Sequence, residues 1–396
     1  MSLLNLASPP PPRRLKRLPL ALLLAGSASW THGYAAETET PVPAPAGKTA
    51  TATSQLETVT VTTRRREESS QDVPTPMSVV SGTTLETQRV YRIQDLQQLV
   101  PSVNVAYMHA RQSSVSIRGL GNNPASDGLE GSVGLYIDNV YLGRPGMAVF
   151  DLMDIEQLEV LRGPQGTLFG KNTTAGVINI STRAPSFTPE RSIETSVGED
   201  GYFQTKGTIS GPLNDVLAGR LSAYRTRSDG DIKNEFNGHD LNGGSRDGFR
   251  AQLLFKPNEN FNLRWIGDYN EEDSSAGTRV LYNTGPTING VNLYSARAAA
   301  AGATLVNGSH RKVNLDNDQH VTVHQGGTSV EANWTLPSDF TLTSVSSYRF
   351  WNFTPRNDDG LNVPATYNAG VSVEDKQYSQ EFRLASPKGE FFDYVV

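Results

Sequence analysis

The sequence has no cysteine among its 396 residues, which excludes structural disulfides, thiolate metal sites and cysteine nucleophiles together. Its 35 Lys and Arg stand against 41 Asp and Glu, and this net charge of −6 argues against nucleic acid as a partner. No apolar run approaches the roughly 20 residues that a membrane-spanning helix needs. Glycine is abundant, with 36 residues beside many Thr, Ser and Asn, which favours an all-β protein with many turns and long polar loops.

The N-terminus carries the pattern of an export signal. A group of basic residues comes first: Arg13, Arg14, Lys16 and Arg17. The apolar run Leu18–Ala25 follows, and Gly33 and Ala35 supply small residues at −3 and −1 for cleavage before Ala36. A short buried helix is the alternative, but the order of charge, apolar run and cleavage site indicates a signal peptide over residues 1–35.

A leader without a core of its own is predicted over residues 36–71. Its first part, to about Gln55, is rich in Pro, Ala, Thr and Glu and cannot bury enough apolar surface to fold. The alternating segment Leu56–Thr62 then predicts one strand, followed by the charged run Arg64–Glu68. The pattern leaves two interpretations open: a first strand of the next domain, or an exposed segment that adds to the edge of another protein's sheet.

Short mixed elements are predicted over residues 72–187. Strands are expected at Val73–Val80, Val115–Gly119, Leu158–Leu161 and Val177–Ile180, and a small helix at Ile93–Val100, which Pro101 ends. The clearest signal is a hairpin, Val133–Ile137 and Val140–Leu142, around the two-residue turn Asp138-Asn139. These residues predict a small α+β domain.

Several segments of this domain resemble the plug of TonB-dependent receptors in order and spacing. They are Ser116–Gly119, Tyr136–Val140, Ile155–Gly170 and Gly176–Ile180. The resemblance implies a plug whose motif residues are Gly119, Asp138, Gly163, Pro164, Gly166 and Gly170. The strand before the plug resembles a TonB box, made of Glu57, Thr58, Val59, Thr60, Val61 and Thr62. In that family the box is the periplasmic segment seized by the energy-transducing protein TonB.

The resemblance also places the plug inside a barrel lumen. Arg118 and Arg162 each stand at a strand end beside a glycine. A buried guanidinium must be paired, because stranding it costs about 3–5 kcal/mol. We therefore expect these arginines to latch the plug to barrel-wall glutamates, with Glu381 as the candidate partner. The alternatives are surface arginines that favour solubility, and a hydrated lumen charge at Glu381.

Residues 188–396 are predicted to form antiparallel transmembrane strands of a β-barrel. In one strand Phe261, Leu263, Trp265 and Tyr269 share a face opposite Asn262, Arg264, Asp268 and Asn270. The same alternation recurs in Arg250–Lys256, Ser329–Leu336 and Gln380–Leu384, where Phe382 and Leu384 would face lipid. Apolar-out and polar-in alternation at this length is typical of outer-membrane strands, although a soluble sandwich also alternates.

Connector lengths support the barrel. Short turns are predicted at Gly198–Gly201, Leu213–Val216, Pro257–Asn260 and Pro337–Asp339, in alternation with long loops at about Ser228–Asp247, Glu272–Gly326 and Asn352–Asp375. Long loops of such barrels lie outside the cell. His310, His320 and His324 are expected as isolated residues of the second long loop, without a metal site. Eight or nine strands are predicted up to Val396, against about 22 in plugged transporters, so the barrel is expected to be incomplete.

No enzyme motif is recognised. The glycine-rich stretch from Gly163 to Lys171 resembles a phosphate-binding P-loop, but Gln165 stands where that motif needs glycine and Asn172 where it needs Ser or Thr. A nucleophile elbow, a His-Glu-x-x-His motif and a glycosidase carboxylate pair are not found.

These expectations combine into active import of a scarce solute, above all a ferric siderophore, across the bacterial outer membrane. TonB with ExbB and ExbD is the expected partner, the leader lies in the periplasm, and iron enters only within the transported chelate, so no resident cofactor or metal is predicted. Tyr107, His109 and Arg111, with the loop Asn122–Gly131, are the candidates for ligand contact, because aromatic and cationic groups suit an anionic chelate. The alternatives are import of cobalamin, haem or an oligosaccharide, and a truncated remnant that transports nothing.

Overall fold

The computed structural model describes residues 60–62, 64–66, 68–122, 129–306, 311–358, 360–364, 370–389 and 392–396. All of them belong to one compact unit, Glu57–Val396. The predicted signal peptide, most of the leader, the box residues Glu57, Thr58 and Val59, and His310 lie outside the described residues. So do residues 123–128 of the predicted ligand loop.

The plug is built on a five-stranded sheet with the order β3-β9-β10-β7-β8. Its strands are β3 (Met77–Ser81), β9 (Ile155–Arg162), β10 (Gly176–Thr182), β7 (Val133–Ile137) and β8 (Val140–Tyr141). β10 and β7 run parallel, and the other neighbours are antiparallel. A second, antiparallel sheet contains β4 (Val103–Tyr107), β5 (Ser113–Ile117) and β6 (Leu120–Asn122). The predicted α+β domain is confirmed.

The Asp138-Asn139 hairpin forms as predicted. Asp138 and Asn139 both adopt positive φ, at 46° and 65°, which is the geometry of the tight turn that fits the twist of two paired strands. Asp138 also ties the turn to the end of β10, since its carboxylate accepts hydrogen bonds from the Thr182 backbone N–H at 2.9 Å and hydroxyl at 2.8 Å. A plug motif residue therefore fixes the hairpin against the central strand.

Helices are few and short. They are α1 (Gly82–Thr87), the 3₁₀ helices η1 (Ile93–Gln98), η2 (Ala110–Gln112) and η3 (Pro145–Ala148), α2 (Gly166–Phe169), and α3 (Leu293–Ala300) in a long loop. None of the described helices is long and apolar enough to cross a membrane. The helix predicted at Ile93–Val100 is a 3₁₀ helix, because Leu99 N–H bonds Leu96 C=O at 3.0 Å in the tighter i to i+3 pattern.

The described end of the segment predicted as a TonB box, Thr60–Thr62, does not lie free. β1 (Thr60–Val61) pairs antiparallel with β2 (Glu68–Ser69), and Val61 is fully buried. Thr62 N–H donates to the buried carboxylate of Glu159 on β9 at 2.8 Å. Of the two interpretations that the pattern left open, the described residues therefore favour a strand that lies against the plug domain over an exposed segment.

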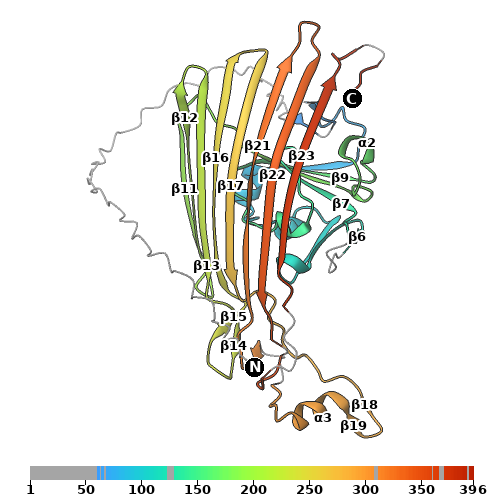
Figure 1. Ribbon diagram of the computed structural model, residues 1–396, viewed down its shortest axis with the longest axis vertical. Coiled ribbons are helices and arrows are strands. Elements are labelled where there is room, and N and C mark those ends of the chain that lie inside the picture. Colours follow the sequence, from blue (N-terminus) through green and yellow to red (C-terminus); the bar gives the residue numbers. More distant parts are fainter. Residues whose placement is uncertain are drawn as a thin grey trace, which may run out of the picture. The chain divides into compact units, whose positions relative to one another are not determined.

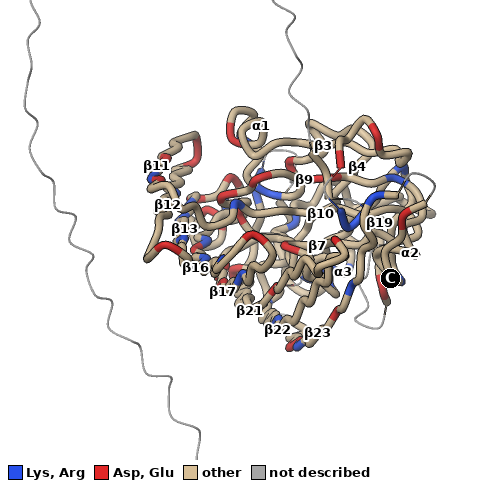
Figure 2. Tube along the Cα trace, turned by 90° about the horizontal axis from the view of Figure 1, so that it is seen from above, with Lys and Arg blue, Asp and Glu red and all other residues tan. Residues whose placement is uncertain are grey.

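Eight antiparallel strands form the wall beside the plug (Figure 1). They are β11 (Glu190–Val197), β12 (Phe203–Asn214), β13 (Leu217–Ser228), β16 (Gly244–Asn258), β17 (Phe261–Ser274), β21 (His320–Thr335), β22 (Thr341–Arg356) and β23 (Val373–Ala385). Each pairs with the next along the chain. Seen from above, the strands follow one another along one side of the plug sheet (Figure 2). The predicted boundary at 187/188 falls between β10 and β11.

The predicted faces of the wall strands are confirmed. On β17, Arg264 reaches the plug, where it donates to Thr182 C=O at 3.0 Å. On β21, Glu331 accepts from Asn139 of the plug at 2.8 Å, while Trp334 is half exposed on the other face. Phe382 on β23 is likewise exposed away from the plug. Polar side chains point inward because the plug supplies their partners, whereas outward positions meet lipid.

The long connections gather at one end of the wall (Figure 1). They carry β14 (Ile232–Asn234), β15 (Asp240–Leu241), β18 (Thr287–Ile288), β19 (Val291–Asn292), β20 (Lys312–Val313) and α3. The predicted short turn Gly198–Gly201 joins β11 to β12. It therefore lies at the long-loop end of the wall, opposite the end where the other predicted short turns lie. His320 and His324 belong to β21 and not to a loop, because the strand ladder continues beyond its apolar part.

The plug and the wall share one apolar core. Ile117, Leu158 and Ile178 of the plug belong to the same cluster of buried side chains as Trp351 and Phe353 of β22. Val321 and Val323 of β21 complete its wall side. The core therefore holds the plug at the long-loop end of the wall, where its apex reaches the outer loops.

Candidate functional site

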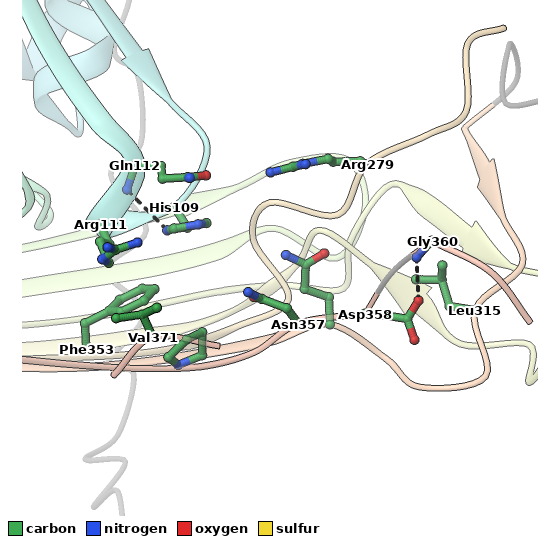
Figure 3. A pocket seen from close by; sticks show the side chains of 12 residues that line it. His109, Arg111, Gln112, Arg279, Leu315, Phe353, Asn357, Asp358, Gly360 and Val371 are labelled. Carbon is green, nitrogen blue, oxygen red and sulfur yellow. Dashed lines mark hydrogen bonds between the residues drawn. The ribbon is translucent and has the colours of Figure 1, made fainter. Parts of the chain in front are cut away.

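A cavity of about 240 Å³ opens where the plug apex meets the outer loops (Figure 3). The plug contributes His109, Arg111 and Gln112 from η2 and the residue before it. The loops and strand ends contribute Arg279, Leu315, Gln319, Phe353, Pro355, Asn357, Asp358, Gly360 and Val371. Of the predicted ligand residues, the structure brings His109 and Arg111 together in this cavity.

His109 forms an uncharged, aromatic part of the cavity wall. Its ring stacks on Phe353 with 5.1 Å between ring centroids, and its Nδ1 accepts from Gln112 N–H at 3.3 Å, which caps η2. Burial, with help from the positive charges of Arg111 and Arg279, lowers the pKa of His109 to about 4. The imidazole is therefore neutral at neutral pH.

The positive charge of the cavity comes from its two arginines. Arg111 belongs to η2, while Arg279 is exposed on the loop between β17 and β21 and donates to Met108 Sδ at 3.2 Å. Asp358 is the carboxylate of the lining. The result is a cavity with an aromatic wall, two guanidinium groups and one carboxylate, which suits a ligand that is anionic and partly apolar.

Tyr107 lies in a neighbouring cavity of about 550 Å³ and not in that of His109. Its hydroxyl donates to Glu272 of β17 at 3.3 Å, and burial and the Glu272 charge raise the pKa of Tyr107. Arg92 lies over its ring at 5.4 Å. Met108 and Arg279 border this second cavity, and Arg279 also lines the first, so the two spaces are adjacent.

The predicted latch arginines do not reach the wall. Arg118 is exposed at positive φ (54°) in the turn between β5 and β6, and has no ion-pair partner among the residues that the structure describes. Arg162 turns to the plug itself, where Nε donates to Ser102 Oγ at 2.9 Å and Nη2 donates to Ser78 Oγ. The pairing expected between either arginine and Glu381 is therefore not formed, because Arg118 is exposed and Arg162 bonds two serines of the plug.

Glu381 instead meets Arg65, which follows the segment predicted as a TonB box. Arg65 Nη2 lies 4.0 Å from Glu381 Oε2, and Arg383 of the same strand lies 3.2 Å from the other oxygen. Arg65 is buried over the ring of Phe169, at 4.3 Å, and donates to Asn139 Oδ1 at 2.7 Å. The predicted wall glutamate thus contacts the leader and the plug, with a different cation.

Two buried aspartates before β9 make close ion pairs between plug and wall. Asp151 accepts from Arg246 Nε on β16 at 2.7 Å. The Asp154 carboxylate accepts hydrogen bonds from Nε and Nη2 of Arg220 on β13, at 2.5 and 2.6 Å. Both aspartate side chains are almost fully buried. Charge-assisted pairs of this kind are strong when both partners are desolvated and satisfied, so these aspartates hold the plug.

Sequence reasoning missed these four residues although a signal existed. Arg246 occupies the inward face of β16, a strand whose outward face was recognised as apolar, and Arg220 lies on the neighbouring strand β13. An inward charge needs an opposite charge inside the lumen, and Asp151 and Asp154 are plug carboxylates just before a predicted strand. Their identity as partners depends on the distance across the lumen, which the sequence does not contain.

Comparison with known proteins agrees with this architecture. The family model described as "TonB-dependent Receptor Plug Domain" matches residues 69–177. The pesticin receptor of Yersinia pestis is 34% identical over 186 residues, covering 46% of this chain and 26% of that receptor. The ferrichrome outer membrane transporter/phage receptor of Escherichia coli is 26% identical over 152 residues, covering 37% of this chain and 19% of the relative. The matched segment is therefore about a quarter or less of each curated relative.

Solved structures share the fold. The ferric yersiniabactin uptake receptor of Yersinia pestis has a TM-score of 0.67 at 24% identity, covering 81% of this chain and 47% of that one. The ferripyoverdine receptor of Pseudomonas aeruginosa has a TM-score of 0.64 at 16% identity, covering 84% of this chain and 42% of that one. These relatives are receptors and transporters and not enzymes. Over residues 69–177 the chain therefore carries a plug domain of the TonB-dependent receptor family, and its antiparallel wall shares the fold of solved outer-membrane receptors.

Proposed function

We propose that the chain takes part in active import of a ferric siderophore, bound as an anionic chelate in the cavity of His109, Arg111 and Arg279. The observation that carries this proposal is the joining of plug apex and outer loops around that cavity, since a ligand there touches both parts at once. The iron belongs to the cargo and not to the protein.

The chemistry of the cavity favours a chelate over a neutral solute. Arg111 and Arg279 supply donors for carboxylate, catecholate or hydroxamate oxygens, and His109 with Phe353 supplies a flat apolar surface. Relatives that share the plug include receptors for ferric chelates and vitamin B12 transporters, so cobalamin is the comparison ligand in every assay.

The energy for import would come through the TonB box, pulled by TonB with ExbB and ExbD. Supporting this, the described end of the predicted box makes few contacts: a two-residue pairing of β1 with β2, and hydrogen bonds from Thr62 to Glu159 of the plug. Such a segment can be released into a β-strand addition without unfolding the sheet behind it.

Removing the positive charge of the cavity should weaken ligand binding. In the double variant Arg111→Gln, Arg279→Gln we expect affinity for an anionic ferric chelate to fall roughly 10- to 100-fold, because a hydrogen bond to a charged group contributes about 1.5–3 kcal/mol. Titration of the purified receptor with ferric catecholate and hydroxamate chelates measures it. The matched control is Arg297→Gln, an exposed arginine of α3 outside the cavity, which should bind as wild type. Equal affinities of double variant and wild type would contradict this binding site.

Chelate binding should not follow the titration of an ordinary histidine. His109 has a depressed pKa of about 4 in the folded protein, against about 6.5 when unfolded. Its neutral form therefore contributes stability that is present above pH 6.5 and is lost as pH falls toward 4. We expect the affinity ratio of wild type to His109→Gln to stay within roughly twofold between pH 8 and 5.5. A ratio that rises tenfold on acidification would show a charged imidazole and a wrong assignment.

A further inference from the structure

The outer loops contain a small folded module. β14, β15 and β20 form a three-stranded sheet, with β14 and β20 parallel, and they join the loop after β13 to the loop before β21. Its core consists of Ile232, Leu241, Val313 and Leu315, all buried. We call residues 231–241 together with 311–318 the loop module. A core of four apolar side chains is small, so polar contacts must supply much of its order.

One fully buried amide side chain organises this module. Asn234 Nδ2 donates to Leu315 C=O at 3.0 Å, and Asn234 Oδ1 accepts from Leu315 N–H at 3.0 Å. Both main-chain polar groups of Leu315 are thus fixed by a single side chain from another loop. Since buried polar groups are costly when unpaired, no apolar residue can replace Asn234 without exposing or stranding these groups.

Asn234 also binds Asp318, which is a second junction of the module. Asp318 Oδ1 accepts from Asn234 Nδ2 at 2.9 Å and from Asn237 Nδ2 at 2.9 Å. The other carboxylate oxygen lies 2.5 Å from His239 Nδ1. The main-chain oxygen of Asp318 accepts from Arg356 Nε at the end of β22, at 3.2 Å. The module is thereby tied to the next wall strand.

The third outer loop is attached to the same stretch of chain. Asp316 N–H donates to Leu361 C=O at 3.3 Å, and Asn317 N–H donates to Asp358 Oδ2 at 3.3 Å. Asp358 in turn accepts from Gly360 N–H at 2.7 Å (Figure 3). Three loops, which follow β13, β17 and β22, therefore converge on residues 315–318.

This convergence lies at the wall of the ligand cavity. Leu315 and Gln319 line the cavity from the second loop, and Asp358 and Gly360 line it from the third (Figure 3). Asn234 itself lies outside the lining. A side chain that touches no ligand thus fixes the main chain of one cavity residue and, through Asp318, the neighbour of another.

We propose that Asn234 is a positioning residue for ligand binding, which through Leu315 and Asp318 makes the three outer loops present their cavity side chains as one body. This inference rests on the proposed function, because it assigns Asn234 a role in the affinity of that cavity. It predicts that disturbing Asn234 changes order in loops that are far apart in sequence, and changes affinity without changing the energised step.

Hydrogen exchange on the ligand-free receptor tests the coupling. In Asn234→Ala we expect the amides of Leu315, Asp316 and Asn317 to exchange roughly 10- to 100-fold faster. The exchange rate of the Gly360 amide in the third loop should increase as well. Affinity for the chelate and the half-saturation concentration of uptake should worsen roughly tenfold, with an unchanged maximal uptake rate. Asn237→Ala is the matched control, since it removes two exposed hydrogen bonds, one to Asp318 and one from His239 N–H, and should change neither readout appreciably.

Exchanging the amide of Asn234 and the carboxylate of Asp318 separates a positioning role from a general loss of folding. Asn234→Asp keeps the shape but puts a carboxylate against Asp318 and Leu315 C=O, so it should be at least as harmful as alanine. Adding Asp318→Asn restores a donor between residues 234 and 318, although Leu315 C=O still faces a carboxylate, so the double variant should recover part of the exchange protection and affinity lost in Asn234→Asp.

The outcomes separate this proposal from the proposed function. Unchanged exchange in Asn234→Ala, faster exchange confined to the first loop, or absence of rescue in the double variant would each overturn the positioning role, whether or not a ligand binds. Faster exchange in all three loops with unaltered affinity would overturn it as well. Failure of the wild-type receptor to bind any chelate would overturn the proposed function instead.

Discussion

Thr60→Pro is expected to abolish energised uptake while leaving chelate binding at the cell surface intact, as is deletion of Glu57–Thr62. A segment that adds to another protein's sheet must offer its backbone N–H groups and an extended conformation. Proline removes the N–H and restricts the chain, whereas Thr60 is exposed and its side chain carries no plug contact that the change would break. Thr60→Ala, which keeps the N–H, is the control and should transport normally.

The measurement compares uptake of an iron-labelled chelate with binding to the same cells after de-energisation. We expect uptake in Thr60→Pro at the level of de-energised wild type, with binding within twofold of wild type. Loss of binding together with uptake would mean that the segment supports the plug fold and not energy coupling. Normal uptake would remove the segment from the mechanism altogether.

The sequence predicted the wall strands well because lipid imposes a simple rule on them. Outward residues such as Trp265 and Phe382 must be apolar and inward ones such as Arg264 must be polar, and this alternation is visible without any structure. The prediction ended the strands too early at the outer end. On β17 the outward-facing side chains change from the apolar Tyr269 to the charged Glu271. The apolar pattern therefore stops, while the hydrogen-bonded backbone pairing continues to Ser274.

The candidate site was predicted only in part, for a related reason. Local chemistry identified His109 and Arg111 at the plug apex, because aromatic and cationic groups are visible as residue types. Arg279 and Asn234 belong to long loops without a periodic pattern, and their roles depend on which loops touch. The prediction of the plug–wall latch was wrong for a similar reason. Arg118 was chosen because a glycine follows it, whereas its ion-pair partner depends on distances between plug and wall.

Asp151→Ala should produce the largest loss of stability between plug and wall. The Asp151 side chain is fully buried and accepts from three consecutive wall strands: Gln204 on β12 at 3.0 Å, Thr226 on β13 at 2.5 Å, and Arg246 on β16. Removing the carboxylate strands a cation with little access to water, at a cost of about 3–5 kcal/mol. Asp151→Asn keeps an acceptor and should lose less.

Native-state hydrogen exchange of the β9 and β10 amides measures this loss, which corresponds to exchange faster by roughly two to three and a half orders of magnitude. Glu190→Gln is the control, because Glu190 pairs with Arg220 from a half-exposed position and should cost less than about 1 kcal/mol. Unchanged exchange in β9 and β10 would show that the shared apolar core around Trp351, and not the Asp151–Arg246 pair, holds the plug in place.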